Sequence, residues 1–112
     1  MAVLFFFFTM DNSNILAQIP PTIYIRPGAS DPAALTPFDP PVANYGLVAG
    51  PVTVTWINQD NTYHTVTSLT NSFDSPMIAA NGGNFSNTFY DSGYYEYHCT
   101  LHPYMTGAVN IS

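Results

Sequence analysis

The chain has 112 residues, enough for one domain with one hydrophobic core but not for two. The chain has seven acidic side chains and a single basic one, Arg26, which gives a net charge of -6. This charge repels phosphate groups and argues against nucleic acid and anionic membrane surfaces as partners. With one cysteine, Cys99, the chain cannot form an internal disulfide, a four-cysteine iron–sulfur site or a two-cysteine dinuclear copper site.

Residues 1–18 differ in composition from the rest of the chain. The run Ala2–Phe8 is strongly apolar but too short to span a bilayer, which takes about 20 residues, and no basic residue precedes it. Two interpretations stay open: an export segment ending near Leu16-Ala17-Gln18, or an arm that packs on the domain. The first predicts a periplasmic or other extracytoplasmic location and is compatible with a membrane tether. Both leave residues 19–112 as a single domain.

The first half of that domain contains two short strand patterns separated by a long irregular stretch. Thr22–Ile25 is a β-type run in which Ile23 and Ile25 are expected to face the core. Residues 29–46 are rich in proline and turn formers, and we expect a long surface loop there. Val52–Trp56 alternates strictly between apolar and polar residues, which predicts a half-buried strand.

The second half contains more strand patterns, connected by turns. Tyr63–Thr67 reads as a strand with His64 on its inward face, and residues 68–83 are turn-rich. Tyr94–Cys99 alternates so that Cys99 points inward, whereas the adjacent His98 points outward. Phe85 and Phe89 mark one more strand, and Gly107–Ile111 supplies the last. Short strands bounded by turns predict an all-β fold, an antiparallel Greek-key β-sandwich or barrel.

Three side chains that can bind a metal stand at intervals of three residues, beginning at the last residue of the Tyr94–Cys99 strand. They are the thiol of Cys99, the imidazole of His102 and the thioether of Met105. His64 lies about 35 residues upstream, on a strand whose inward face could meet Cys99 in a sandwich. Two histidines, a cysteine and a weak axial methionine suit a one-electron copper site. Buried packing for Cys99 and Met105, and a hydrogen-bonded core role for His64, are the competing interpretations.

The run Tyr97–Met105, together with His64-Thr65-Val66, resembles the cupredoxin family, the type 1 blue copper proteins, and its short ligand loop is most similar to amicyanin-type members. The resemblance implies one copper ion per chain, with His64, Cys99 and His102 as equatorial ligands and Met105 as the axial ligand. It also implies an electron carrier that docks redox protein partners through an apolar patch near His102, made of Leu101, Pro103 and Tyr104.

One departure from the family pattern concerns the residue after the first ligand histidine. Many cupredoxins have asparagine there, and its side chain ties the two ligand loops together, whereas this chain has Thr65. Its backbone N–H can still reach the Cys99 sulfur, and whether its side chain replaces the tie stays open.

Other functions stay open at this point. If the axial position is vacant, the chain would be a copper-dependent oxidoreductase acting on nitric oxide, nitrite or oxygen. A copper-delivery protein would usually carry more methionines and cysteines per ion. Zinc can use the same four ligands, although copper(II) binds such sites more tightly.

Overall fold

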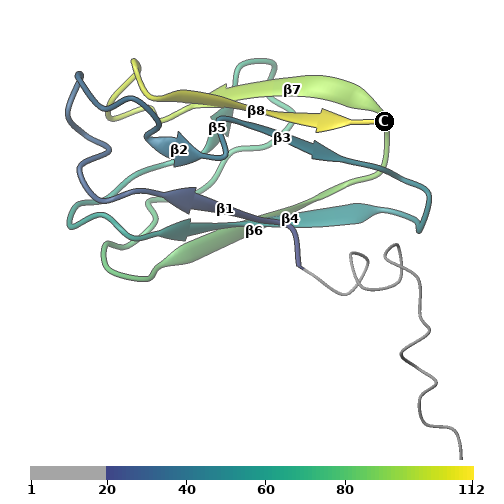
Figure 1. Ribbon diagram of the computed structural model, residues 1–112, viewed down its shortest axis with the longest axis horizontal. Helices are drawn as coiled ribbons and strands as arrows, with labels where there is room; N and C mark the ends of the chain where they lie inside the picture. Colours follow the sequence, from purple (N-terminus) through teal and green to yellow (C-terminus); the bar gives the residue numbers. More distant parts are fainter. Residues whose placement is uncertain (1–19) are drawn as a thin grey trace, which may run out of the picture.

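The computed structural model describes residues 20–112, which form a sandwich of two four-stranded sheets (Figure 1). The expectation of an export segment or packing arm at residues 1–18 lies outside the described residues. Within residues 20–112 no helix is long and apolar enough to cross a membrane. The strands are β1 Thr22–Ile25, β2 Phe38–Asp39, β3 Val42–Tyr45, β4 Val52–Asn58, β5 Thr67–Ser68, β6 Asn84–Phe89, β7 Gly93–His98 and β8 Thr106–Ile111.

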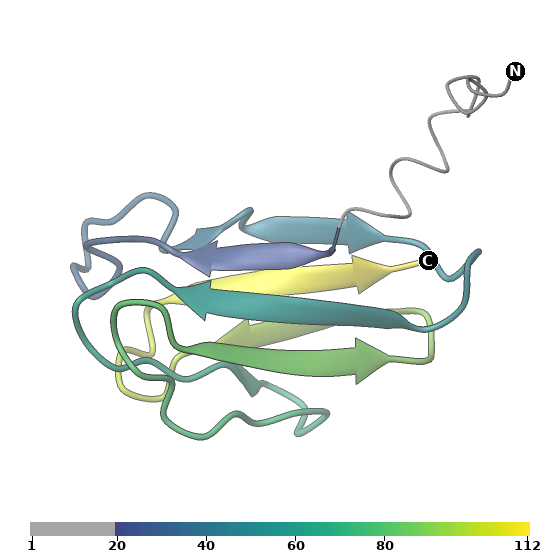
Figure 2. The same cartoon turned by 90° about the horizontal axis from the view of Figure 1, so that it is seen from below.

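The two sheets are mixed rather than purely antiparallel. One has the order β2-β1-β4-β6 and the other β3-β8-β7-β5. Figure 2 shows β1, β4 and β6 side by side in the first sheet. The β1–β4 and β3–β8 pairs are parallel, and the other pairs are antiparallel. The predicted all-β sandwich is therefore confirmed, with two parallel pairings that the strand patterns do not reveal.

Strict alternation along the strands places one face of each sheet in the core. In β4 the side chains of Val54 and Trp56 are fully buried, as predicted, while the intervening threonines face outward or are half-buried. From the opposite sheet, Tyr97 packs edge-on against Trp56, with 5.4 Å between ring centroids and 87° between ring planes. Such aromatic contacts add to the hydrophobic burial that holds the sheets together.

The prediction of a long loop at residues 29–46 is wrong in its second half. Strands β2 and β3 form there because Phe38 and Ala43 are buried against the core. Both are edge strands, at the end of their sheets. An edge strand needs its N–H groups on one side only, so it tolerates the prolines that surround β2 and β3.

The segment around His64 is not a regular strand. His64 forms a single bridge with Ile78, and regular pairing begins only at Thr67, in β5. Next to it, the Val66 N–H donates to the Ser75 hydroxyl at 2.8 Å and the Ser75 N–H donates to the Val66 carbonyl at 2.9 Å. The inward orientation of His64 and Val66 is nevertheless as predicted, since both are fully buried.

Candidate metal centre

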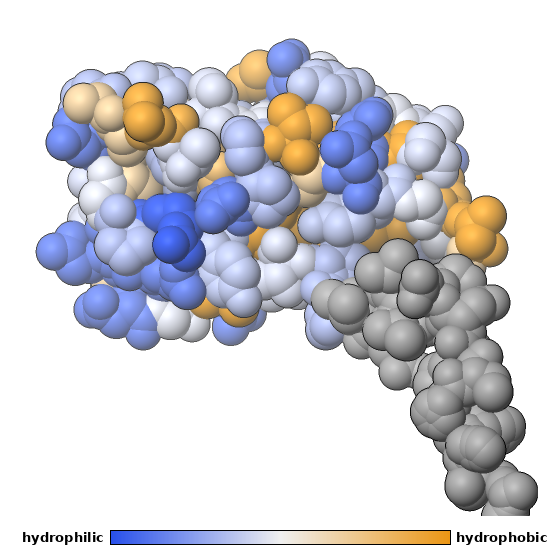
Figure 3. Space-filling model, viewed as in Figure 1, coloured by the Kyte–Doolittle hydropathy of each residue, from blue (hydrophilic) through white to orange (hydrophobic). Residues whose placement is uncertain are grey.

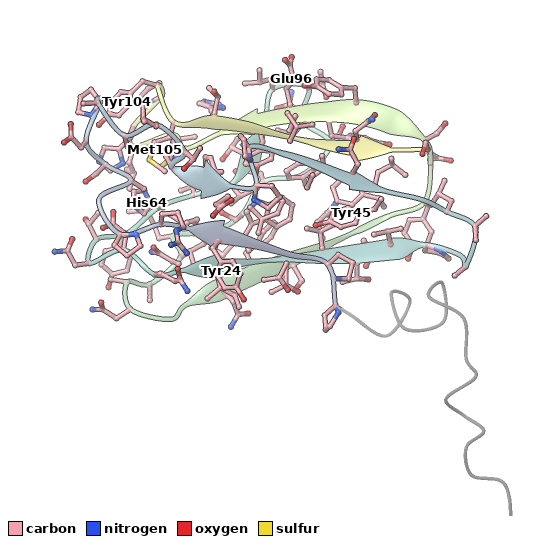
Figure 4. The ribbon with its side chains drawn as sticks, in the orientation of Figure 1. Tyr24, Tyr45, His64, Glu96, Tyr104 and Met105 are labelled. Carbon is pink, nitrogen blue, oxygen red and sulfur yellow. The ribbon has the colours of Figure 1, made fainter. Side chains whose placement is uncertain are left out.

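The structure brings His64, Cys99 and His102 together at one end of the sandwich. His64, labelled in Figure 4, lies at the end opposite the C-terminus in Figure 1. One donor atom from each of the three residues lies within 4.8 Å of the others. The Cys99 sulfur is 3.7 Å from His64 Nδ1 and 3.8 Å from His102 Nδ1. The sulfur and the two Nδ1 atoms therefore form a triangle of donor atoms.

Cys99, His102 and Met105 are held in a tight loop between β7 and β8. The Met105 N–H donates to the His102 carbonyl at 2.8 Å, and the Cys99 N–H donates to the Met105 carbonyl at 3.2 Å. Met105 and Cys99 are fully buried, whereas His102 is half-buried. Figure 4 shows Met105 at the same end of the sandwich as His64. The loop thus hides its two sulfur side chains and leaves one imidazole reachable from outside.

These three donors fit a single metal ion. With metal–nitrogen bonds of about 2.0 Å and metal–sulfur bonds of about 2.3 Å, a sulfur and a nitrogen on one ion lie roughly 3.5–3.8 Å apart at angles of 110–120°. The two observed sulfur–nitrogen distances, 3.7 and 3.8 Å, match this range. The mixed nitrogen and sulfur donor set is one that copper and zinc both accept.

The surroundings of Cys99 favour its thiolate, the form that binds metals. Burial alone would raise the pKa of the Cys99 thiol, but hydrogen bonds from His64, from the backbone N–H of Thr65 and from His102 outweigh it and lower the pKa to about 6. The Thr65 N–H lies 3.3 Å from the sulfur, as predicted. Near neutral pH the sulfur is therefore already charged.

Asp60 lies behind His64, on the side away from Cys99. Its Oδ2 is 2.7 Å from His64 Nε2, and both side chains are buried. Burial alone would raise the pKa of the Asp60 carboxyl, but hydrogen bonds from His64, Gly28 and Asn61 outweigh it and lower that pKa. An ionised carboxylate only accepts hydrogen bonds, so His64 carries a proton on Nε2. Nδ1 is the nitrogen that faces the Cys99 sulfur.

The pKa of the His64 imidazole depends on burial and on its two neighbours, Cys99 and Asp60. Burial lowers the pKa of its imidazole, but contacts with Cys99 and Asp60 outweigh burial and raise it.

The side chain of Thr65 ties the two ligand loops together, which settles the point that the sequence left open. Its Oγ1 accepts the backbone N–H of Thr100 at 2.8 Å and lies 3.0 Å from the Thr100 hydroxyl. Threonine is shorter than asparagine, but Thr100 follows Cys99 directly and comes close enough for a hydroxyl to reach. The tie is therefore retained with a different side chain.

Comparison with known proteins finds relatives with a similar sequence and fold. No family model matches the chain. Amicyanin from Paracoccus denitrificans is 39% identical over 64 residues, 53% of this chain, and the chain spans about half (48%) of that relative's length. The solved structure of a purple cupredoxin from Nitrosopumilus maritimus has a TM-score of 0.73 and 28% identity, and the match covers 82% of this chain and 99% of that one. In sequence and in fold, the chain is similar to the cupredoxins.

A second solved structure, the reduced Cu(I) form of an amicyanin variant at pH 4, matches this chain with a TM-score of 0.64 and 27% identity, covering 86% of this chain and 88% of that one.

Sequence reasoning missed two contacts of the site. Asp60 precedes His64 by four residues in a polar turn, where an acidic residue is usually solvated, so its burial behind the imidazole carries no local signal. Tyr104 is expected in the exposed patch, and the contact in which its hydroxyl donates to the Ser30 carbonyl is not predicted. His98 lies outside the donor cluster, half-buried, with Nδ1 3.2 Å from the Thr67 carbonyl.

Proposed function

We propose that this chain binds one copper ion and transfers single electrons between redox proteins. The observation that carries the proposal is the gathering of the Cys99 sulfur and one imidazole nitrogen each from His64 and His102 within 4.8 Å of one another. His64 Nδ1, Cys99 Sγ and His102 Nδ1 would hold the ion, and Met105 would be the axial ligand. A copper ion in this donor set supplies a one-electron Cu(I)/Cu(II) couple.

The chain's own residues suit this role because they hold the donors in place. Asp60 orients His64, the Thr65 N–H and side chain fix Cys99 and its loop, and backbone bonds close the loop around Met105. Donors held this way change their positions little when the charge of the site changes, so the energy of reorganisation stays small. Full burial of Cys99 and Met105 also keeps bulk water away from the sulfur atoms.

Two similarities support the choice of copper. One matching solved structure is the Cu(I) form of an amicyanin variant, and another is a purple cupredoxin. Carried over to this chain, they favour copper over zinc at the same donors. We extend the proposal to an extracytoplasmic location, on the same similarity.

The docking surface in this proposal surrounds the half-buried His102. Leu101 is 45% exposed and Tyr104 is 47% exposed, and Pro103 between them is exposed as well. On the face shown in Figure 3, apolar residues form separate groups among polar ones. A partner that covers His102 would bury these apolar side chains and receive the electron through the exposed imidazole edge.

The test is spectroscopy and voltammetry of the copper-loaded protein. We expect one copper per chain, an intense visible thiolate-to-copper band and a reversible one-electron wave. Cys99→Ser should abolish the band, whereas His98→Ala, one position away and outside the cluster, should keep it. A protein that binds Cu(II) and stays colourless would refute the proposal.

The alternative function, an oxidoreductase with an open copper position, has its own outcome in the same assay. Added azide or nitrite would then shift the visible band. The full burial of Met105 supports a closed site, and we expect no shift.

A further inference from the structure

The segment Gly28–Ser30, between β1 and β2, contacts both halves of the metal centre from outside the ligand loops. On one side the Gly28 N–H donates to Asp60 Oδ1 at 3.0 Å, and Asp60 Oδ2 holds His64. On the other side the Ser30 carbonyl accepts the hydroxyl of Tyr104, two residues after His102. We name the segment Gly28–Ser30 the brace.

The brace is itself anchored in the core. The side chain of Ala29, its middle residue, is 1% exposed and belongs to the hydrophobic core cluster. The Ala29 N–H donates to the Arg26 carbonyl and the Asp31 N–H donates to the Gly28 carbonyl, both at 3.0 Å, so the backbone turn is closed on both sides. Gly28 has φ +83°, a conformation that favours glycine. These contacts make the brace a short, fixed connection.

We infer that the brace couples the two histidines through Asp60 and Tyr104, which are positioning residues of the metal centre. Asp60 sets which nitrogen of His64 carries the proton, and Tyr104 holds the loop that carries His102. The inference rests on the proposed function, since it assigns a role at the same site.

A carboxylate suits position 60 better than its amide. Asp60 accepts three N–H groups: Nε2–H of His64 and the backbone N–H groups of Gly28 and Asn61, the last at 2.9 Å. An amide has only one acceptor oxygen. If that oxygen keeps Gly28 and Asn61, the NH₂ group faces His64 and the imidazole must move its proton to Nδ1, the nitrogen that faces Cys99. If the amide instead turns its oxygen toward His64, the Gly28 N–H of the brace loses its acceptor.

The ring of His102 also depends on the Tyr104 end of the brace. The two rings are in edge contact, with 6.0 Å between centroids. A phenylalanine at position 104 keeps this ring contact but loses the hydroxyl bond to Ser30. The substitution therefore tests the brace with little change in packing.

The first experiment measures the full-length, metal-free chain by nuclear magnetic resonance. At a pH high enough for a neutral His64 imidazole, we expect the Nε2–H tautomer in the native protein and the Nδ1–H tautomer in Asp60→Asn. We also expect the Gly28 amide to exchange faster with solvent in Tyr104→Phe, although Tyr104 does not hydrogen-bond to Gly28. The control is Tyr94→Phe, which removes an exposed hydroxyl on the outer face of β7.

The second experiment titrates the same proteins with Cu(I). We expect affinity to fall about 10–100-fold for Asp60→Asn and about threefold to tenfold for Tyr104→Phe, with no change for Tyr94→Phe. If Tyr104→Phe matches Tyr94→Phe in Gly28 exchange and in Cu(I) affinity, the inference is wrong, and this holds even if Asp60→Asn fails to fold. If the Cu(II) form of the native protein lacks a visible band, the proposed function is wrong instead. The measurements on the metal-free protein then still test the role of the brace.

Discussion

The tie between Thr65 and Thr100 leads to a stability prediction. Thr65→Val keeps the branched shape of the side chain but removes its hydroxyl. The Thr100 N–H, which donates to that hydroxyl at 2.8 Å, then loses its partner. A buried N–H without a partner costs about 1–3 kcal/mol. Because Thr100 is exposed, water replaces part of the lost bond, and we expect about 1–2 kcal/mol.

The assay is equilibrium denaturation of the metal-free protein, with thermal unfolding as a check. A loss of this size lowers the melting temperature by roughly 4–16 °C for a domain of this length. The matched control is Thr53→Val on the exposed face of β4, where Thr53 Oγ1 lies 2.7 Å from Thr88 Oγ1 and water can take over. We expect the control to stay within about 0.5 kcal/mol of the native protein. Equal stabilities for the two variants would refute the reasoning.

Two further predictions concern Cys99 and Gly107. In the metal-free protein the ultraviolet absorbance of the Cys99 thiolate should disappear as the pH falls through about 6. A thiol with the ordinary pKa of 9.0 would already be neutral at pH 7. A titration midpoint above pH 8 would contradict the described hydrogen bonds. Gly107→Ala should destabilise the protein by about 1–3 kcal/mol in denaturation experiments. The reason is that the new Cβ would lie 2.5 Å from the hydroxyl of the fully buried Tyr97. The control is Gly46→Ala, whose Cβ would have its nearest neighbour at 3.9 Å and which should be as stable as the native protein.

The sequence by itself determined the features that depend on neighbouring residues along the chain. Strict alternation identified the strand at Val52–Trp56 and the inward direction of Cys99, because side chains of a strand alternate between its two faces. The intervals of three between Cys99, His102 and Met105 brought a thiol, an imidazole and a thioether into one loop. Those local patterns were enough to predict an all-β sandwich and to choose the candidate donors.

Only the tertiary structure decided the features that join distant segments. The parallel pairing of β3 with β8 and the short strand β2 depend on which partners are available, not on the strands' own patterns. In the sequence Asp60 has the pattern of a solvated turn residue. In the structure it accepts hydrogen bonds from Gly28, 32 residues away, and from His64. Tyr104 meets Ser30 across 74 residues. Hydrogen bonds of this range leave no periodic signal in the chain, because each depends on how the two sheets and their loops come together in space.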